Sequence, residues 1–334
     1  MATNYLYGTV LTGEAVAANN SGDNIGNTTT LQKVFHQDDL HSSVSAEAIR
    51  FAIRYRFQLE LKDSQVNRKY NPDTGKVRYK DDKWTDWSPS ADVFADDDLM
   101  GFMNAAAAKQ EREEEDAETE VSGEENKGPK SSKRKAKGKA YKRTSPLAVG
   151  RAVSLRPYRG ELSFNCTVRK EDEKGNSSGL SLYNAEMHTT EYQYSFGLNL
   201  NDVINKENIG HLIDAVVDPP PVAGNHSRFA YDFSPSSIVL RVTDAHSSKI
   251  QNCFEHDEER RSYTVERLIH RVESGDIPAG ELIVGGELAG TAEGKKLASL
   301  GVKGFPGVKA AANEARKRIA GFGQDFAGVK PKEA

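Results

Sequence analysis

Apolar positions follow two different periods along the first sixty residues, and each period predicts a different element. Residues 5–17 mix aromatic and β-branched side chains and predict an opening strand. From Ser43 the apolar residues recur at helical spacing, which predicts a helix that ends near residue 55 or 57. Ser42, Ser43 and Ser45 are N-cap candidates for it, and FQLEL then continues as a strand or a last helical turn. The polar segment between, 18–35, has no period and predicts a long loop.

The second half of the chain repeats the alternation of strands and helices after a mixed segment at 62–104. Three consecutive prolines, Pro219 to Pro221, end one of the helices. The order of elements is compatible with an α+β sandwich of the RRM type that carries long insertions. The predicted strands lie at the end of 144–168, at 191–200 and at 236–244, and the predicted helices at 201–217, 263–274 and 314–322.

Charge is strongly segregated in a chain of 334 residues whose net charge is only −4. Residues 111–125 hold nine acids and one base, and residues 127–143 hold nine bases and no acid. Blocks of like charge without apolar residues cannot bury enough surface to offset the entropy of ordering. We therefore expect a disordered or mobile insertion at about 106–141. Because the whole chain is slightly acidic, binding to a polyanion requires such local segregation.

Cysteine use and hydropathy indicate the compartment. Cys166 and Cys253 are far apart in the sequence and form no metal-ligand pair, which favours a reduced setting. The first residues lack the features of a signal peptide, and no window approaches the ~20 apolar residues of a membrane helix. The sequence thus predicts a soluble cytoplasmic protein without a membrane partner.

The helix predicted from Ser43 carries candidate chemistry for anion binding. Ser43, Glu47, Arg50 and Arg54 are spaced by four, three and four residues and so are predicted to share one helical face. Two arginines one turn apart, beside hydroxyls and a helix N-terminus, form a suitable phosphate cradle. The alternative is a solvated face on which Glu47 pairs with one of the arginines.

No catalytic signature is present. The sequence lacks HExxH, CxxC, Walker A and GxSxG patterns, and we predict neither a cofactor nor a bound metal. The run Asp96, Asp97 and Asp98 offers carboxylates for Mg²⁺, but consecutive side chains diverge, so a solvated turn is the favoured interpretation.

Several short segments together resemble one family. HSSVSAEAIRFAIR (41–54) is similar to the Arg- and Ser-rich loop and first helix of backbone subunits of type I CRISPR effector complexes, and NNSGDNIGNTTTLQK stands where that family has an Asn-rich loop. DDDLMGFM followed by RTSPLAVGRAVSL resembles the paired signature of the DevR-type branch found in type I-B systems. YNAEMHTTEYQYSFGLNLNDV and GNHSRFAYDFSPSSIVLRVTD resemble two later family strands with their loops. The resemblance extends from about residue 7 to 244.

The resemblance implies a fold. A modified RRM (ferredoxin-like) palm would comprise residues 1–60 and 144–334, with a helical fingers insertion at 60–145 and a β-hairpin thumb at 167–190. The turn-rich segment RKEDEKGNSSGLS independently reads as an excursion between two strands. In the family the thumb wedges under a flipped nucleotide, which makes Leu182 and Met187 candidate wedges. The alternative is an ordinary surface hairpin.

The resemblance also implies a function: a non-catalytic subunit that oligomerises head to tail along crRNA and presents it to target DNA, together with other Cascade subunits. Arg143, Arg151, Arg156 and Arg159 flank the return into the fold, although Arg151 and Arg156 could instead pair with surface carboxylates. GNHSR, taken alone, could be a simple turn. The candidate RNA-binding residues are Asn20, His41, Ser43, Ser45, Arg50, Arg54, Arg143, Arg159, Arg169, Lys170, Asn225, His226 and Arg228.

Two other functions stay open at this point. Related type III backbone subunits cleave RNA with a loop aspartate and a divalent metal, for which Asp23, Asp38 and Asp39 are candidates here. The type I branch argues against this activity. A transcriptional autoregulator is the other alternative, but no helix-turn-helix with a basic recognition helix is visible.

Overall fold

The fold is seen in a computed structural model of the whole chain, which describes residues 4–18, 20–36, 38–84, 88, 92–104, 141–166, 182–222, 231–259 and 262–332. None of the helices in these residues is long and apolar enough to cross a membrane. The charged stretch at 106–140 lies outside the described residues. So do the candidate residues Arg169, Lys170, Asn225, His226 and Arg228.

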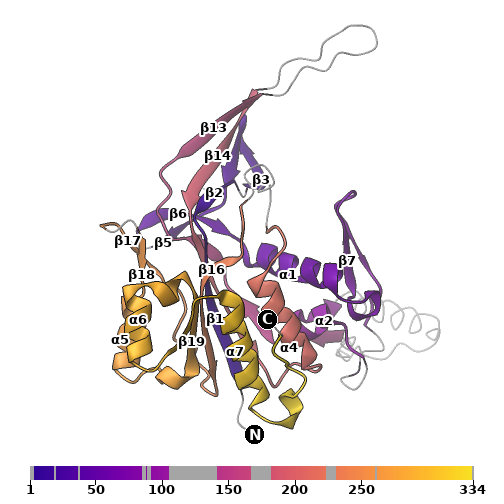
Figure 1. Cartoon of the computed structure of the whole chain (residues 1–334). Coiled ribbons are helices and arrows are strands. Elements are labelled where there is room, and N and C mark those ends of the chain that lie inside the picture. The colour runs from indigo at the N-terminus through magenta and orange to yellow at the C-terminus, as the bar shows by residue number, and fades with distance from the viewer. Residues whose placement is uncertain are drawn as a thin grey trace, which may run out of the picture.

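A nine-stranded sheet forms the centre of this mixed α+β fold (Figure 1). Its order is β20–β19–β16–β1–β15–β12–β6–β5, and β11 also pairs with β15. The first strand, β1, is antiparallel to both of its neighbours, β15 and β16. The strands are β1 (Tyr5–Thr12), β5 (Lys33–His36), β6 (Asp39–Val44), β11 (Leu147–Val149), β12 (Ala152–Ser154), β15 (Tyr192–Asn199), β16 (Pro235–Thr243), β19 (Leu282–Gly286) and β20 (Lys303–Phe305).

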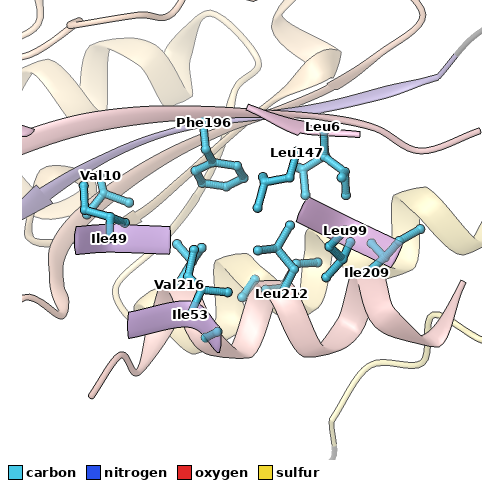
Figure 2. Close-up of a cluster of buried hydrophobic side chains, with 14 of the residues drawn as sticks. Leu6, Val10, Ile49, Ile53, Leu99, Leu147, Phe196, Ile209, Leu212 and Val216 are labelled. Atoms are coloured by element: carbon cyan, nitrogen blue, oxygen red, sulfur yellow. The ribbon is translucent and has the colours of Figure 1, made fainter. Parts of the chain in front are cut away.

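Four helices cover one face of this sheet. Alternate residues of β1, Leu6 and Val10, point into a core that Ile53 and Leu212 complete from the helices (Figure 2). All four side chains are 3% exposed or less, and burying each stabilises the fold by about 1.5–3 kcal/mol. The helices are α1 (Ala46–Glu60), α2 (Ala95–Met100), α4 (Glu207–Val217) and α7 (Val308–Ala320).

The C-terminal segment covers the other face of the sheet. Its strand β19 contributes side chains to the cores on both faces. Ile283 belongs to the core beneath the four helices, whereas Val284 packs with Leu11 and Leu268 on the opposite side. Residues after 244, which contribute little to the sequence resemblance, therefore complete the sheet. This layer contains α5 (Glu266–Glu273), α6 (Ala292–Ser299), β17 (Glu255–Asp257), β18 (Ser262–Thr264) and the 3₁₀ turns Ala279–Glu281 and Glu287–Gly290, and a further 3₁₀ turn, Gln324–Phe326, follows α7.

The first helix confirms its predicted capping. The Ser45 hydroxyl accepts a hydrogen bond from the Ala48 amide at 3.2 Å, so Ser45 is the N-cap of α1. FQLEL is helical, because α1 continues to Glu60 with Phe57 buried in the core. Two later helices have other limits than predicted: α4 starts at Glu207 and α7 at Val308.

The prediction of a long loop at 18–35 is wrong, and the predicted strand 5–17 is broken near Gly13. The segment contains β3 (Asn20–Ile25), β4 (Thr28–Leu31) and β5, and β2 (Ala15–Ala17) precedes them. The reason is a partner far away in the sequence, since β4 pairs in parallel with Asn184 and Ala185. Two further strand pairs lie at the other end of α1: β7 (Arg68–Asn71) with β8 (Lys76–Tyr79), preceded by the 3₁₀ turn Asp63–Gln65, and β9 (Phe102–Asn104) with β10 (Tyr141–Arg143).

Candidate nucleic-acid interface

A pair of long strands projects from the central sheet (Figure 1). They are β13 (Glu161–Cys166) and β14 (Leu182–Thr190), which are antiparallel from Glu161 opposite Met187 to Cys166 opposite Leu182. On the other side, β14 pairs with β4, and β4 pairs with β3. The projection is therefore a small sheet of its own and is wider than a single hairpin.

One face of this projection is apolar and open to solvent. Residues paired across a β-sheet point to the same side, so Leu162, Phe164 and Leu182 share a face, and Ile25 on β3 joins them. Their side chains are 59%, 70%, 43% and 76% exposed, respectively. We call these four residues the β13–β14 apolar face. Exposed apolar residues gathered in this way indicate a binding surface.

The two predicted wedge residues do not lie on the same surface. Leu182 belongs to the apolar face, whereas Met187 pairs with Glu161 on the opposite side and is half-buried. Sequence reasoning missed Leu162 and Phe164. Their signal is the alternation of apolar and polar residues in ELSFNC, which predicts that both side chains point the same way.

The predicted array of Ser43, Arg50 and Arg54 on one exposed helical face is wrong. Ser43 lies in β6, before the helix, and is fully buried. The guanidinium of Arg50 turns inward and donates to the carbonyls of Met100 at 2.9 Å and Leu147 at 3.0 Å. Both carbonyls belong to elements that pack against α1, so Arg50 joins these elements together.

Arg54 is half-buried, and its environment is more cationic than the sequence suggests. Burial, followed by the positive charges of Arg68 and Arg50, lowers the pKa of Arg54 to about 10, while Asp96 and Asp97 oppose the shift. The Nε atom of Arg54 is buried and has no hydrogen-bond partner among the described residues. Arg54 therefore keeps hydrogen-bonding capacity that Arg50 has used.

Two further candidate RNA contacts are engaged inside the fold, which contradicts their predicted exposure. Arg143 donates to a carboxylate oxygen of Asp98 at 2.5 Å and to the Asp98 carbonyl. His41 is only 4% exposed, and its Nδ1 lies 2.7 Å from the Ser154 carbonyl. Burial lowers the pKa of His41, so the ring is neutral at pH 7 and gives no charge to a phosphate.

The run Asp96–Asp98 is not a solvated turn, because it forms part of α2 and is buried. The three residues are 1%, 1% and 0% exposed. Asp96 accepts hydrogen bonds from the amides of Asn67 and Arg68, and Asp98 accepts from Ile204 and Asn205. Both oxygens of Asp96 and of Asp98 are thus used by protein donors, and Asp97 accepts from Asn67 and Trp84 through one oxygen, Oδ2. Among the described residues, no group of three or more histidine, cysteine or acidic side chains is arranged to hold a metal ion.

Two arginines remain accessible near the projection. Arg159 is 81% exposed and lies 3.9 Å from Glu258. Arg151 donates to Gln32 at 3.1 Å and to the hydroxyl of Ser43 at 3.2 Å. Arg156 pairs with Glu14 and Glu191, as its salt-bridge interpretation predicts. The backbone of Asn20 lies in β3, and its side chain is outside the described residues.

A pocket of about 430 Å³ opens at the foot of the projection and is lined by Arg156, Arg159, His188 and His256, together with Glu161 and Glu258. Burial lowers the pKa of His188 to about 4. Its Nδ1 is hydrogen-bonded to Ser42 at 2.7 Å. At pH 7 His188 therefore lines the pocket as a neutral ring that is already hydrogen-bonded.

Comparison with known proteins identifies the family. The model of the family described as CRISPR-associated negative auto-regulator DevR/Csa2 matches residues 9–272, most of the chain. This chain belongs to the DevR/Csa2 family. A Myxococcus xanthus (strain DK1622) relative, CRISPR-associated protein Cas7/Cst2/DevR, is 33% identical over 320 residues, covering 94% of this chain and 97% of the relative.

Two solved structures share the fold of this DevR/Csa2 member. A chain of a CRISPR RNA-guided surveillance complex superposes with a TM-score of 0.53 at 13% identity, covering 93% of this chain and 99% of the other. A chain of such a complex in a pre-nicking state gives a TM-score of 0.52 at 12% identity, covering 93% of this chain and 100% of the other. At this identity the likeness concerns the fold alone.

Proposed function

We propose that this DevR/Csa2 protein is a non-catalytic backbone subunit that binds a guide RNA and lines up head to tail along it. Membership of the DevR/Csa2 family and structural likeness to chains of CRISPR RNA-guided surveillance complexes support this proposal. In such a complex the subunit presents the guide for pairing with target DNA, and the other Cascade subunits are its partners. Sequence is then read by base pairing while the protein holds the backbone.

The β13–β14 apolar face is the observation that carries the proposal. A projecting sheet with Phe164 and Leu162 exposed can insert between the faces of successive bases, a contact worth roughly 1–3 kcal/mol per base. This wedge is independent of sequence, because every base has an apolar face. The projection is the thumb in this proposal, and Leu182 is part of its wedge.

The cations beside the projection are proposed to hold the ribose-phosphate backbone. Arg159 and Arg151 are the accessible guanidiniums, and neither depends on the identity of the bases. Ser43 is removed from this set because it is fully buried, and Arg50, Arg143 and His41 are removed because their donors serve the fold. The other candidate contacts stay proposals: Asn20, Ser45, Arg54, Arg169, Lys170, Asn225, His226 and Arg228.

The non-catalytic character is also a proposal. The buried acids Asp96 and Asp98 of α2 are bonded to protein donors, so they do not offer a metal site, and the loop candidates of the ribonuclease alternative, Asp23, Asp38 and Asp39, are tested by experiment. Incubation of the guide-loaded protein with complementary RNA and Mn²⁺ checks this point. Intact RNA is expected, and cleavage would contradict the proposal.

The proposal is tested by copurification with the neighbouring subunits. We expect a discrete small RNA to accompany the protein in a fixed ratio, with several copies of this chain per RNA. The double substitution Leu162→Ser and Phe164→Ser should weaken guide binding about tenfold or more without lowering the melting temperature, because both side chains are exposed. Binding is measured by fluorescence anisotropy with guides of several sequences.

Phe322→Ser is the matched control. This residue is also an exposed phenylalanine, 40% accessible, but it follows α7 far from the projection. The control should bind the guide like the unmodified protein. Equal guide affinity for the double variant and the control would remove the apolar face from the interface, and a monomer indifferent to single-stranded RNA would refute the function.

A further inference from the structure

The strand ladder between the central sheet and the β13–β14 projection is interrupted. β1 pairs with β15 as far as Leu11 opposite Gln193, and pairing resumes with Ala15 of β2 opposite Thr190 of β14. Strands can bend where a ladder is interrupted, because regular backbone hydrogen bonds do not continue across that point. The angle of the projection to the central sheet therefore depends on contacts between side chains.

Glu186 makes a contact that joins the two sheets. It lies in β14 at the foot of the β13–β14 apolar face, directly opposite Leu162, and so points to the same side. Its Oε2 accepts a hydrogen bond from the Leu31 amide at 2.7 Å and pairs with Lys33 Nζ at 2.5 Å. Leu31 ends β4, and Lys33 begins β5, the outer strand of the central sheet (Figure 1). One carboxylate oxygen therefore connects the projection to the edge of the central sheet.

Tyr158 completes this contact from a third segment, the loop between β12 and β13. Lys33 Nζ lies 4.6 Å from the centre of its ring, its hydroxyl bonds to Glu186, and its amide donates to the Leu40 carbonyl of β6 at 2.6 Å. Burial, followed by the charge of Glu186, raises the pKa of Tyr158, so the hydroxyl keeps its proton and donates. The side chains of Glu186 and Lys33 are 15% and 20% exposed. We call Glu186, Lys33 and Tyr158 the brace, because a carboxylate held by several donors and largely removed from water resists displacement.

A second contact lies nearer to the central sheet and is buried. His188 of β14 is hydrogen-bonded to Ser42 of β6 at 2.7 Å, and the ring of Tyr158 meets the His188 ring edge to face at 5.4 Å. Ser42 and His188 are 0% and 4% exposed, so replacing either would disturb folding. The brace lies closer to solvent, and its polar groups can be changed without opening the core.

We propose that Glu186 is a positioning residue, which through Lys33 and Tyr158 holds the β13–β14 projection at one angle to the central sheet before any ligand binds. The consequence for guide RNA rests on the proposed function, whereas the fixed angle does not. A projection already held at its binding angle loses less freedom when a base inserts beside Phe164, and its affinity is therefore higher than that of a projection free to bend.

The angle can be measured through Cys166, an exposed thiol at the last residue of β13. Cys253 is buried, so Cys166 alone of the two cysteines takes a spin label. Ala298→Cys, at an exposed position of α6, supplies the second label. Double electron–electron resonance on the RNA-free, full-length protein then gives the distribution of distances between the labels. We expect one narrow peak with the brace intact, and its loss to a broad distribution after Glu186→Gln with Lys33→Met.

This double substitution leaves the net charge unchanged, so the overall attraction of the protein to RNA is the same. Saturating guide RNA should restore the narrow peak, and guide affinity, measured by fluorescence anisotropy, should fall by about threefold to tenfold because binding must now order the projection. Lys303→Met with Glu314→Gln is the matched control. These residues form an ion pair of 2.8 Å between α7 and β20, at the other edge of the central sheet, and their loss should change neither the peak nor the affinity.

A narrow peak in the brace variant, or an equally broad distribution in the control, would overturn the positioning role. If the double variant loses its circular dichroism, Glu186→Gln alone is judged by the same criteria, because it keeps an oxygen for the Leu31 amide. An unmodified protein that binds no guide RNA would refute the proposed function, and the distance distributions would still decide the role of Glu186.

Discussion

Two charged regions that both pack against α1 use their charges in opposite ways. In the hub around α2, the consecutive residues Asp96, Asp97 and Asp98 are nearly inaccessible; Asp96 and Asp98 accept hydrogen bonds from backbone amides, and Asp97 accepts from two side chains. In the β7–β8 hairpin, Lys76 and Arg78 are exposed and have no ion-pair or side-chain hydrogen-bond partner among the described residues. The difference is the supply of partners: other chain segments bring N–H donors to the carboxylates of the hub, whereas no described segment brings an acceptor to these two cations.

This difference assigns the two regions to different tasks. A buried charge is tolerated only when it is paired and hydrogen-bonded, and removing a partner then costs far more than the pair itself contributes. An exposed charge contributes little to stability and stays available to a ligand. Changes in the hub should therefore alter the free energy of unfolding, and changes in the exposed charges of the β7–β8 hairpin should leave it almost unaltered.

The largest expected effect is that of Asp98→Asn in the hub. The carboxylate of Asp98 accepts hydrogen bonds from Ile204, Asn205 and Asn208 and pairs with Arg143. An amide nitrogen would face donors with another donor and would leave the arginine without its charge partner. We expect the free energy of unfolding to fall by about 3–5 kcal/mol, measured by urea denaturation at pH 7.

Asp73→Asn serves as the control for that measurement. Asp73 is exposed in the β7–β8 turn, so its substitution should change the free energy of unfolding by no more than about 0.5 kcal/mol. If both variants unfold at the same urea concentration, the contrast between the hub and the β7–β8 hairpin is wrong.

A smaller effect is expected from Arg50→Ala. This substitution leaves the carbonyls of Met100 and Leu147 without their donor, which should lower the free energy of unfolding by about 1–3 kcal/mol. Guide affinity, measured well below the melting temperature, should not change. Arg151→Ala should behave in the opposite way: unchanged unfolding and weaker guide binding, because Arg151 is exposed. A flatter salt slope for Arg50→Ala would restore Arg50 to the RNA interface.

Local sequence patterns predicted those elements that are determined by residues close together in the sequence. The helix α1 and its cap at Ser45 follow from periodicity and from one hydroxyl three residues before its donor. The hub was missed because its donors lie far away in the sequence: Asn67 is about 30 positions from α2, and Ile204 is about 100. No window of sequence shows that such donors converge, so three aspartates in a row were interpreted as solvated.

The lack of information about contacts between distant residues also explains which candidate site residues were missed. Leu182 was found because it lies in the predicted thumb, and Phe164 was missed because the preceding strand was not placed in the same sheet. Arg50 was predicted to bind RNA from its spacing to Ser43 and Arg54 within the family-like segment, and Arg143 from its position where the chain returns into the fold. Their inward orientation depends on carbonyls and a carboxylate that only the folded chain brings together.

The smallest expected effect separates two aspartates within the hub itself. Asp97 accepts both of its hydrogen bonds, from Trp84 Nε1 and Asn67 Nδ2, at one oxygen, Oδ2, and each bond is 2.7 Å long. Its other oxygen can therefore take a proton without losing them. Burial, followed by the charge of Asp96, raises the pKa of Asp97 to about 6.

A raised pKa in an acid means that the native state binds a proton which the unfolded state releases between about pH 4 and 6. The protein should therefore gain stability from this group as the pH falls from 7 towards 4, by at most about 1.4 kcal/mol per pH unit. Asp97→Asn cannot take up this proton but keeps an oxygen that accepts hydrogen bonds. As the pH falls over that range, the free energy of unfolding of the unmodified protein should therefore rise steadily relative to that of the variant. Urea titrations of both proteins at several pH values measure it. A difference that does not depend on pH would show that Asp97 stays ionised in the folded chain.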